Sequence, residues 1–346
     1  SRSAMHKLQQ HLCPCPKDRG LRTPGRTTGC WYADRGLGLA KRSEKEEVGM
    51  QSGGLVVGLY DVDSKIPNLA LMKLSAHHKS KGDSAELYSP VMHQNYDKIY
   101  ASTIFNYSDK SYLRDDMVVG GTGWDMKVSL PAEVEDLVPD YSLYNYPHNL
   151  GFTMRGCRLK CKFCVVPQKE GTPFATNTID ELWTQRDSDF LVLLDNDFFG
   201  NPEWRDRIEE IKAHGLKVNF NQGINIRNLT EEQAAALASV KFRNLKNNHS
   251  QIYFAWDDPR HEKLIHRGLE RWIQAGIKPY QMAFYVLIGF HSTPEEDLHR
   301  VETLRSYGVD PYAMPYDKDE PYQNRFTRWV NHKAIFNSVA WKDYAR

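Results

Sequence analysis

The chain has 346 residues, more than a usual single domain, so one large or two ordinary domains are expected. Its 40% hydrophobic and 12% aromatic residues supply enough apolar side chains for a core, which excludes a disordered chain. The longest apolar run, Met282 to Phe290, is too short for a membrane-spanning helix, and no leader sequence is evident. We therefore expect a cytoplasmic protein without a membrane partner.

The net charge of +1 is unevenly distributed along the chain. Residues 1–49 carry 10 Lys or Arg and 5 Asp or Glu, and the slightly acidic remainder argues against a nucleic-acid partner. Because this segment has no periodic pattern, we expect a disordered or non-native extension, with Met50 as the natural start. Its cysteines, Cys13, Cys15 and Cys30, leave a second metal site as the less favoured alternative.

Residues 50–127 alternate short apolar strands with a helix and loops, which predicts a small parallel sheet. The expected helix runs from Pro67 to Lys81 and ends at Gly82. Residues 128–147 contain three prolines and are interpreted as a linker. The expected strands are Leu55–Tyr60, Ala85–Tyr88, Lys98–Ala101 and Met117–Val119.

Residues 148–316 repeat one strand–helix unit about six times, and residues 317–346 are expected to form a helical extension from about Thr327 to Ser338. Six units are too few for a closed barrel of eight strands, so we expect a partial (β/α)6 barrel of the TIM type. The expected strands are Leu150–Met154, Phe190–Leu194, Lys217–Phe220, Gln251–Ala255, Gln281–Ile288 and Val309–Met314. The expected helices are Thr178–Gln185, Pro202–His214, Thr230–Ser239, Asp258–Ala275 and Pro294–Tyr307.

Three cysteines follow the first strand of this half within eight residues, at Cys157, Cys161 and Cys164. This spacing indicates metal chemistry, since a disulfide framework would spread its cysteines through a small secreted domain. Three thiolates would leave one iron of a 4Fe–4S cluster open to a further ligand, whereas clusters that only carry electrons normally have four protein ligands. A structural zinc site is the alternative, but it also needs four ligands, and His148 is the nearest candidate.

The cysteine motif, the strand before it and the strand–helix repeats after it resemble the radical S-adenosylmethionine enzymes. The resemblance covers about residues 150–316 and makes Cys157, Cys161 and Cys164 the ligands of a 4Fe–4S cluster. In that family the open iron chelates S-adenosylmethionine, which is cleaved reductively to methionine and a 5′-deoxyadenosyl radical. The resemblance also implies a one-electron donor, such as flavodoxin or ferredoxin.

Further cofactor-binding residues are expected at the carboxyl ends of the later strands. The resemblance places Phe163 beside the adenine and Gly289 at the last adenine-side strand, where a glycine permits close approach of a ring. The commonest family motif after the second strand, Gly-Gly-Glu, is replaced here by an Asp-rich stretch. The remaining candidates for cofactor contacts are Asp195, Asn196, Asp197, Asn221, Gln222, Arg227, Asp257 and Ile288.

The N-terminal half resembles, more faintly, the Rossmann-like cobalamin-binding domain of one radical S-adenosylmethionine subclass. Gly120 and Gly121 match its glycine-rich strand end, but the motif that supplies a histidine ligand to cobalt is absent after the first strand. The resemblance thus implies modification of an unactivated carbon of an unknown substrate, by methylation if cobalamin binds. The alternatives are a methylthiotransferase acting on tRNA or protein, and an iron–sulfur electron carrier.

Overall fold

The computed structural model describes residues 53–344, and these divide after Pro147 into two compact units. Both units are built from parallel sheets and helices, so the predicted α/β class is confirmed. The expectations for residues 1–49, including the second metal site at Cys13, Cys15 and Cys30, lie outside the described part of the chain. No helix within residues 53–344 is long and apolar enough to cross a membrane.

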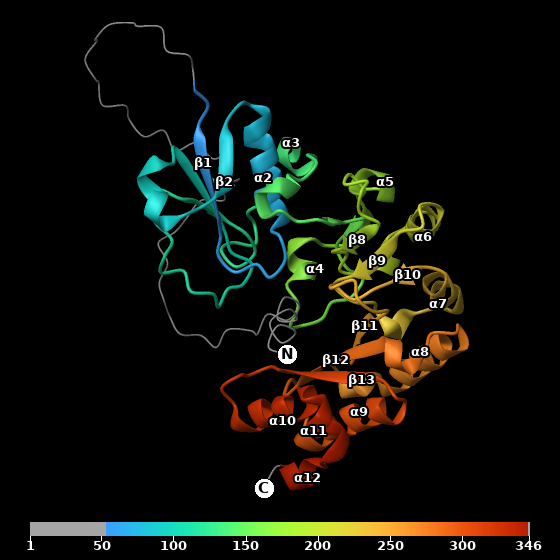
Figure 1. The fold of residues 1–346 in the computed structure, drawn as a ribbon. Coiled ribbons are helices and arrows are strands. Elements are labelled where there is room, and N and C mark those ends of the chain that lie inside the picture. Colours follow the sequence, from blue (N-terminus) through green and yellow to red (C-terminus); the bar gives the residue numbers. More distant parts are fainter. Residues whose placement is uncertain (1–52, 345–346) are drawn as a thin grey trace, which may run out of the picture. The chain divides into compact units, whose positions relative to one another are not determined.

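The first unit is a parallel sheet with strand order β2-β1-β3-β4. Figure 1 labels its neighbouring strands β1 and β2. Leu59 of β1 and Tyr100 of β3 are fully buried in this unit, as are Leu71 and Leu74 of α2. The elements are β1 (Val56–Asp61), α2 (Leu69–Ser80), β2 (Ser84–Leu87), η1 (Pro90–Asn95), β3 (Lys98–Ser102), β4 (Val118–Gly120), α3 (Ala132–Glu135) and η2 (Tyr141–Tyr144).

Two expectations for this unit need correction. Helix α2 begins at Leu69 rather than at Pro67, because the Asn68 side chain accepts hydrogen bonds from the N–H groups of Ala70 and Leu71. The segment expected as a linker, residues 128–147, carries α3 and η2, both of which contact α2. Val134 of α3 is fully buried, so hydrophobic burial holds this segment within the unit.

The second unit contains two larger parallel sheets, with strand orders β10-β9-β8-β5 and β11-β12-β13. The strands are β5 (Asn149–Gly151), β6 (Met154–Arg155), β7 (Phe174–Ala175), β8 (Phe190–Leu193), β9 (Lys217–Phe220), β10 (Lys241–Phe242), β11 (Ile252–Ala255), β12 (Met282–Ile288) and β13 (Asp310–Pro315). The α-helices are α4 (Val166–Lys169), α5 (Ile179–Leu182), α6 (Trp204–Ala213), α7 (Glu231–Ala238), α8 (Glu262–Gln274), α9 (Pro294–Ser306), α10 (Pro321–Asn331), α11 (Lys333–Ser338) and α12 (Trp341–Tyr344). The short 3-10 helices are η3 (Phe198–Gly200), η4 (Ile226–Asn228), η5 (Pro259–His261) and η6 (Pro279–Gln281).

Local sequence signals position most helices of this unit. Thr230 and Thr293 form capping boxes with Gln233 and Glu296, which explains where α7 and α9 begin. Helices α6, α7 and α8 lie along one side of the strands (Figure 1). Helix α10 starts earlier than expected because Glu320 caps it and Pro321 occupies its first turn.

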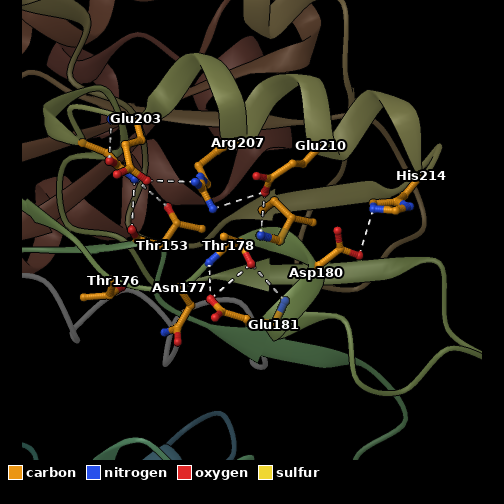
Figure 2. A network of polar contacts seen from close by, with 12 residues as sticks. Thr153, Thr176, Asn177, Thr178, Asp180, Glu181, Glu203, Arg207, Glu210 and His214 are labelled. Atoms are coloured by element: carbon orange, nitrogen blue, oxygen red, sulfur yellow. Dashed lines mark hydrogen bonds and ion pairs between the residues drawn. The ribbon is translucent and has the colours of Figure 1, made fainter.

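A polar network joins α6 to the start of α5 (Figure 2). Arg207 of α6 is buried and lies between two glutamates, 2.8 Å from Glu203 and 3.3 Å from Glu210. Glu210 in turn accepts a hydrogen bond of 2.7 Å from the Ile179 N–H in the first turn of α5. The network therefore satisfies a backbone donor that the helix itself leaves without a partner.

The expected strand Leu150–Met154 is interrupted. It forms β5, which pairs with β8, and then β6, which pairs in antiparallel fashion with β7. The break follows from the buried Asp195 carboxylate, which accepts the N–H groups of Thr153 and Met154. The β6–β7 ladder encloses residues 156–173, and these include all three cysteines of the motif.

Candidate functional site

The cysteine loop, residues 156–173, is held at its base by backbone and charge contacts. The Cys157 N–H donates to the Gly171 carbonyl at 3.2 Å. Glu170 accepts the Gly156 N–H at 2.9 Å and forms an ion pair of 2.9 Å with Arg155. The first cysteine is thus fixed by groups near the far end of the same loop.

The three thiols are half-buried, and none forms a disulfide bond. Burial raises the pKa of Cys157 to about 11, against a hydrogen bond from the Leu159 N–H to its Sγ. Burial likewise raises the pKa of Cys161, and the Arg227 guanidinium opposes that rise. Thiolate, not thiol, is the form that binds a metal. Binding of iron would therefore release the protons of these thiols.

Within residues 53–344 no three His, Cys, Asp or Glu side chains converge as the ligands of a single metal ion. A single ion such as zinc needs its ligands gathered around one centre. In a 4Fe–4S cluster each thiolate binds a different iron, so the three sulfur atoms lie farther apart.

The Asp-rich stretch after β8 contacts the cysteine loop and the strand that leads into it. Asp195 is buried and accepts hydrogen bonds from the Thr153 hydroxyl and N–H. Asn196 donates to Glu170 at 3.1 Å, so the side chain meets the base of the loop. The sequence assigned these residues to a cofactor amino group, and in the structure Asp195 and Asn196 bind the cysteine loop and the strand before it.

Asp197 holds the loop more directly. Both of its carboxylate oxygens accept hydrogen bonds from the Arg158 guanidinium, at 2.7 and 2.8 Å, and Oδ2 also accepts the Arg158 N–H at 3.2 Å. Such a bidentate pair fixes both distance and orientation. Arg158 lies next to Cys157 in the chain. Asp197, in the segment after β8, therefore holds the backbone beside the first cysteine.

Burial of Asp195 should make the free energy of unfolding depend on pH, and substitution of this residue should remove that dependence. Burial raises the pKa of Asp195 to about 7, so the folded state retains a proton that the unfolded chain releases from about pH 4 upward. This lowers the free energy of unfolding as the pH rises toward 7, by up to about 4 kcal/mol. Urea titrations of Asp195→Asn and of the wild type at pH 5 and pH 8 should show a relative gain for the variant at pH 8.

The exposed Asp206 on α6 provides the control for this experiment. Asp206→Asn should change the free energy of unfolding by a similar amount at both pH values. An Asp195→Asn variant whose stability relative to wild type is the same at pH 5 and pH 8 would contradict the assignment.

A pocket of about 290 Å³ lies beside Cys161. It is walled by the cysteine loop, by Arg227 after β9, by residues that follow β11 and by residues that follow β12. Two of its rings, Phe163 and Phe290, meet edge to face with centroids 5.4 Å apart. The full lining is Leu159, Lys160, Cys161, Lys162, Phe163, Arg227, Asp257, Asp258, Arg260, His261, Phe290 and His291.

Arg227 and His261 form a pair in this pocket. The Arg227 guanidinium donates to His261 Nδ1 at 3.1 Å, which places the proton of a neutral imidazole on Nε2. Burial and the positive charge of Arg227 lower the pKa of His261, so the neutral form is favoured. The pocket therefore presents a ring N–H donor together with a guanidinium.

Asp257 lines the same pocket, and its carboxyl group is buried. Burial raises its pKa to about 6, whereas Arg300 and Arg227 act in the opposite direction. One carboxyl oxygen accepts the Leu287 N–H, and Oδ1 has no hydrogen-bond partner within the described part of the chain. Asp258, in contrast, is bound by Arg260 at 2.5 Å and caps η5.

Of the predicted site residues, only Cys161, Phe163, Arg227 and Asp257 line this pocket, and the others include four near the ends of β9 and β12. Asn221 and Gln222 are half-buried just after β9, where the Asn221 N–H donates to the Leu193 carbonyl of β8. The Ile288 side chain is fully buried. Gly289 has a φ of +74°, and a Cβ there would lie 2.2 Å from Gln323 Nε2, so the Gln323 side chain occupies that side of this glycine.

Gly120 is the buried last residue of β4, and Gly121 follows it. Gly121 has a φ of +93°, and a Cβ there would lie 2.3 Å from the Thr103 carbonyl oxygen. The close approach that this glycine permits is therefore to the chain's own backbone, in the loop after β3. Asp63 holds that loop by accepting the N–H groups of Ile104 and Phe105. The space that a side chain at position 121 would need is thus filled by the Thr103 backbone.

Several pocket residues were missed by sequence reasoning. Arg260 and His261 follow β11, and Phe290 and His291 follow β12, so their place after a strand was the available signal. Lys160 and Lys162 alternate with the cysteines inside the motif. No protein-family model and no curated protein matches this chain.

Proposed function

We propose that the chain is a radical S-adenosylmethionine enzyme. The observation that carries the proposal is the Cys157, Cys161 and Cys164 loop, closed by the β6–β7 ladder and bordering a pocket at Cys161. A bound 4Fe–4S cluster would supply the electron for reductive cleavage of S-adenosylmethionine to methionine and a 5′-deoxyadenosyl radical.

The proposal extends to the fold of the second unit. We propose that β5, β8, β9, β11, β12 and β13 together form an open (β/α)6 barrel of the TIM type. In its favour, the two parallel sheets are linked where the Ile224 N–H after β9 donates to the Tyr253 carbonyl of β11 at 2.8 Å. Loops after the strands would then gather at one face, as in other barrels of this type.

The pocket residues have distinct roles in this proposal. Phe163 and Phe290 provide apolar surface for a planar ring. Arg227 and the His261 Nε2–H donate hydrogen bonds to carboxylate or hydroxyl oxygens. Asp195 and Asp197 act indirectly, because they orient the cysteine loop rather than a ligand.

The reaction that fits best is hydrogen abstraction from an unactivated carbon of a substrate, with an external flavodoxin or ferredoxin as electron donor. We do not propose methylation through cobalamin, because the Thr103 backbone lies against Gly121, where the tail of the cofactor was expected. A pure electron carrier is disfavoured by the pocket beside Cys161, which such a protein does not need.

Anaerobic reconstitution with iron and sulfide tests the function. We expect about one 4Fe–4S cluster per chain, and formation of 5′-deoxyadenosine after reduction with dithionite in the presence of S-adenosylmethionine. Iron and sulfide analysis and chromatography of the nucleoside products are the measurements. A chain that binds the cluster but yields no 5′-deoxyadenosine would instead support the electron carrier.

A further inference from the structure

Arg300 on α9 connects the carboxyl ends of two neighbouring strands. Its side chain is fully buried, with 0% exposure. It donates to the Trp256 carbonyl, just after β11, at 2.7 Å, and to the Leu287 carbonyl, near the end of β12, at 2.9 Å. One planar guanidinium therefore fixes the spacing of both strand ends.

Asp297, one turn earlier on α9, is equally buried and pairs with Arg300 at 2.5 Å. Its Oδ1 also accepts the Ser292 hydroxyl at 2.6 Å, and its Oδ2 accepts the Gly289 N–H at 3.3 Å and the Tyr322 hydroxyl at 3.2 Å. A buried ion pair is costly to desolvate unless its remaining atoms are hydrogen-bonded, as they are here. The Arg300–Asp297 pair therefore binds the ends of β11 and β12 through Arg300, and the turn after β12 through Asp297.

Asp257 lies between the two groups that Arg300 holds. It follows Trp256 in the chain, and its carboxyl group accepts the Leu287 N–H. Its Oδ1 has no partner among the described residues, although it belongs to a residue that lines the pocket. A buried carboxylate oxygen without a hydrogen bond is unfavourable, and a donor group that reached Oδ1 would remove this cost.

We propose that Arg300, backed by Asp297, is a positioning residue that orients Asp257 so that Oδ1 accepts a hydrogen bond from an O–H or N–H group of the pocket ligand. The inference rests on the proposed function, which identifies the ligand as S-adenosylmethionine. Lysine cannot replace arginine in this role, because an ammonium lacks the planar fork that reaches two carbonyls at once.

A double-mutant cycle tests the inference, with binding of S-adenosylhomocysteine to the cluster-reconstituted chain as the readout. Asp257→Asn and Arg300→Lys should each weaken binding by about tenfold, the effect of one lost hydrogen bond to a charged group. The double variant should also lose only about tenfold, because Arg300 acts through Asp257. A loss near the product of the two single effects would overturn the positioning role, as would unchanged binding by Arg300→Lys.

Two further variants guard against a folding defect and a general effect of α9. Ser292→Ala removes one neighbour of the Arg300–Asp297 pair, and should weaken binding about threefold in the wild type but not in Asp257→Asn. Arg305→Lys alters another α9 arginine that donates to a carbonyl, that of Phe336, and should leave binding unchanged. If the wild type binds no S-adenosylhomocysteine, the proposed function fails together with this inference. If the wild type binds S-adenosylhomocysteine but the losses of Asp257→Asn and Arg300→Lys multiply in the double variant, the inference fails and the proposed function stands.

Discussion

Replacement of any one of Cys157, Cys161 or Cys164 by alanine is expected to reduce 5′-deoxyadenosine formation to background. Two thiolates cannot hold a cubane in the orientation that leaves one iron open, so the three cysteines act as a unit. Iron per chain should fall in parallel with the activity. The fold should persist, since each thiol is only half-buried and its loss removes little apolar contact.

Cys13→Ala and Cys30→Ala provide the controls for this experiment. These cysteines belong to the segment expected to be a disordered or non-native extension, so both variants should retain the iron content and the cleavage activity of the wild type. Circular dichroism of all variants separates loss of the cluster from loss of the fold. A Cys161→Ala variant with full cleavage activity would refute the cluster assignment.

The parallel strands and most helices could be predicted because their signals are local. The apolar run Leu55–Tyr60 indicates a strand, and the capping boxes at Thr230 and Thr293 indicate where two helices begin, all from a few neighbouring residues. The β6–β7 pairing could not be predicted, because its strands have two residues each and no alternating pattern. Its position depends on Asp195, about forty residues away in the chain.

In the candidate site, too, local features could be predicted and contacts between distant residues could not. The cysteine spacing is local and was evident in the sequence, whereas the contact of Asp197 with Arg158 joins residues 39 positions apart. A glycine indicates that some group approaches closely, but not which group it is. At Gly121 and Gly289 that group is the Thr103 carbonyl and the Gln323 side chain, and neither can be inferred from the glycine itself.

Substitution of Gly156 by alanine should distort the backbone at the base of the cysteine loop. Gly156 has a φ of +82° and precedes Cys157, and a Cβ there would lie 2.4 Å from the Thr172 carbonyl oxygen. The left-handed backbone costs about 1 kcal/mol for alanine, and the clash with a backbone that cannot rotate away adds about 2 kcal/mol. Because Thr172 lies next to β7, relief of the clash would open the ladder at the base of the loop.

Gly171 in the same loop separates the two contributions. It has a φ of +73°, but no atom lies within 4 Å of its Cβ position, so Gly171→Ala bears the backbone cost alone. We expect Gly171→Ala to keep nearly the iron content of the wild type and to lose about 1 kcal/mol in urea unfolding. Gly156→Ala should lose about 3 kcal/mol and most of its iron, because the displaced backbone carries the first thiolate. Equal iron content in the two variants would show that closure of the loop by the β6–β7 ladder is not what positions Cys157.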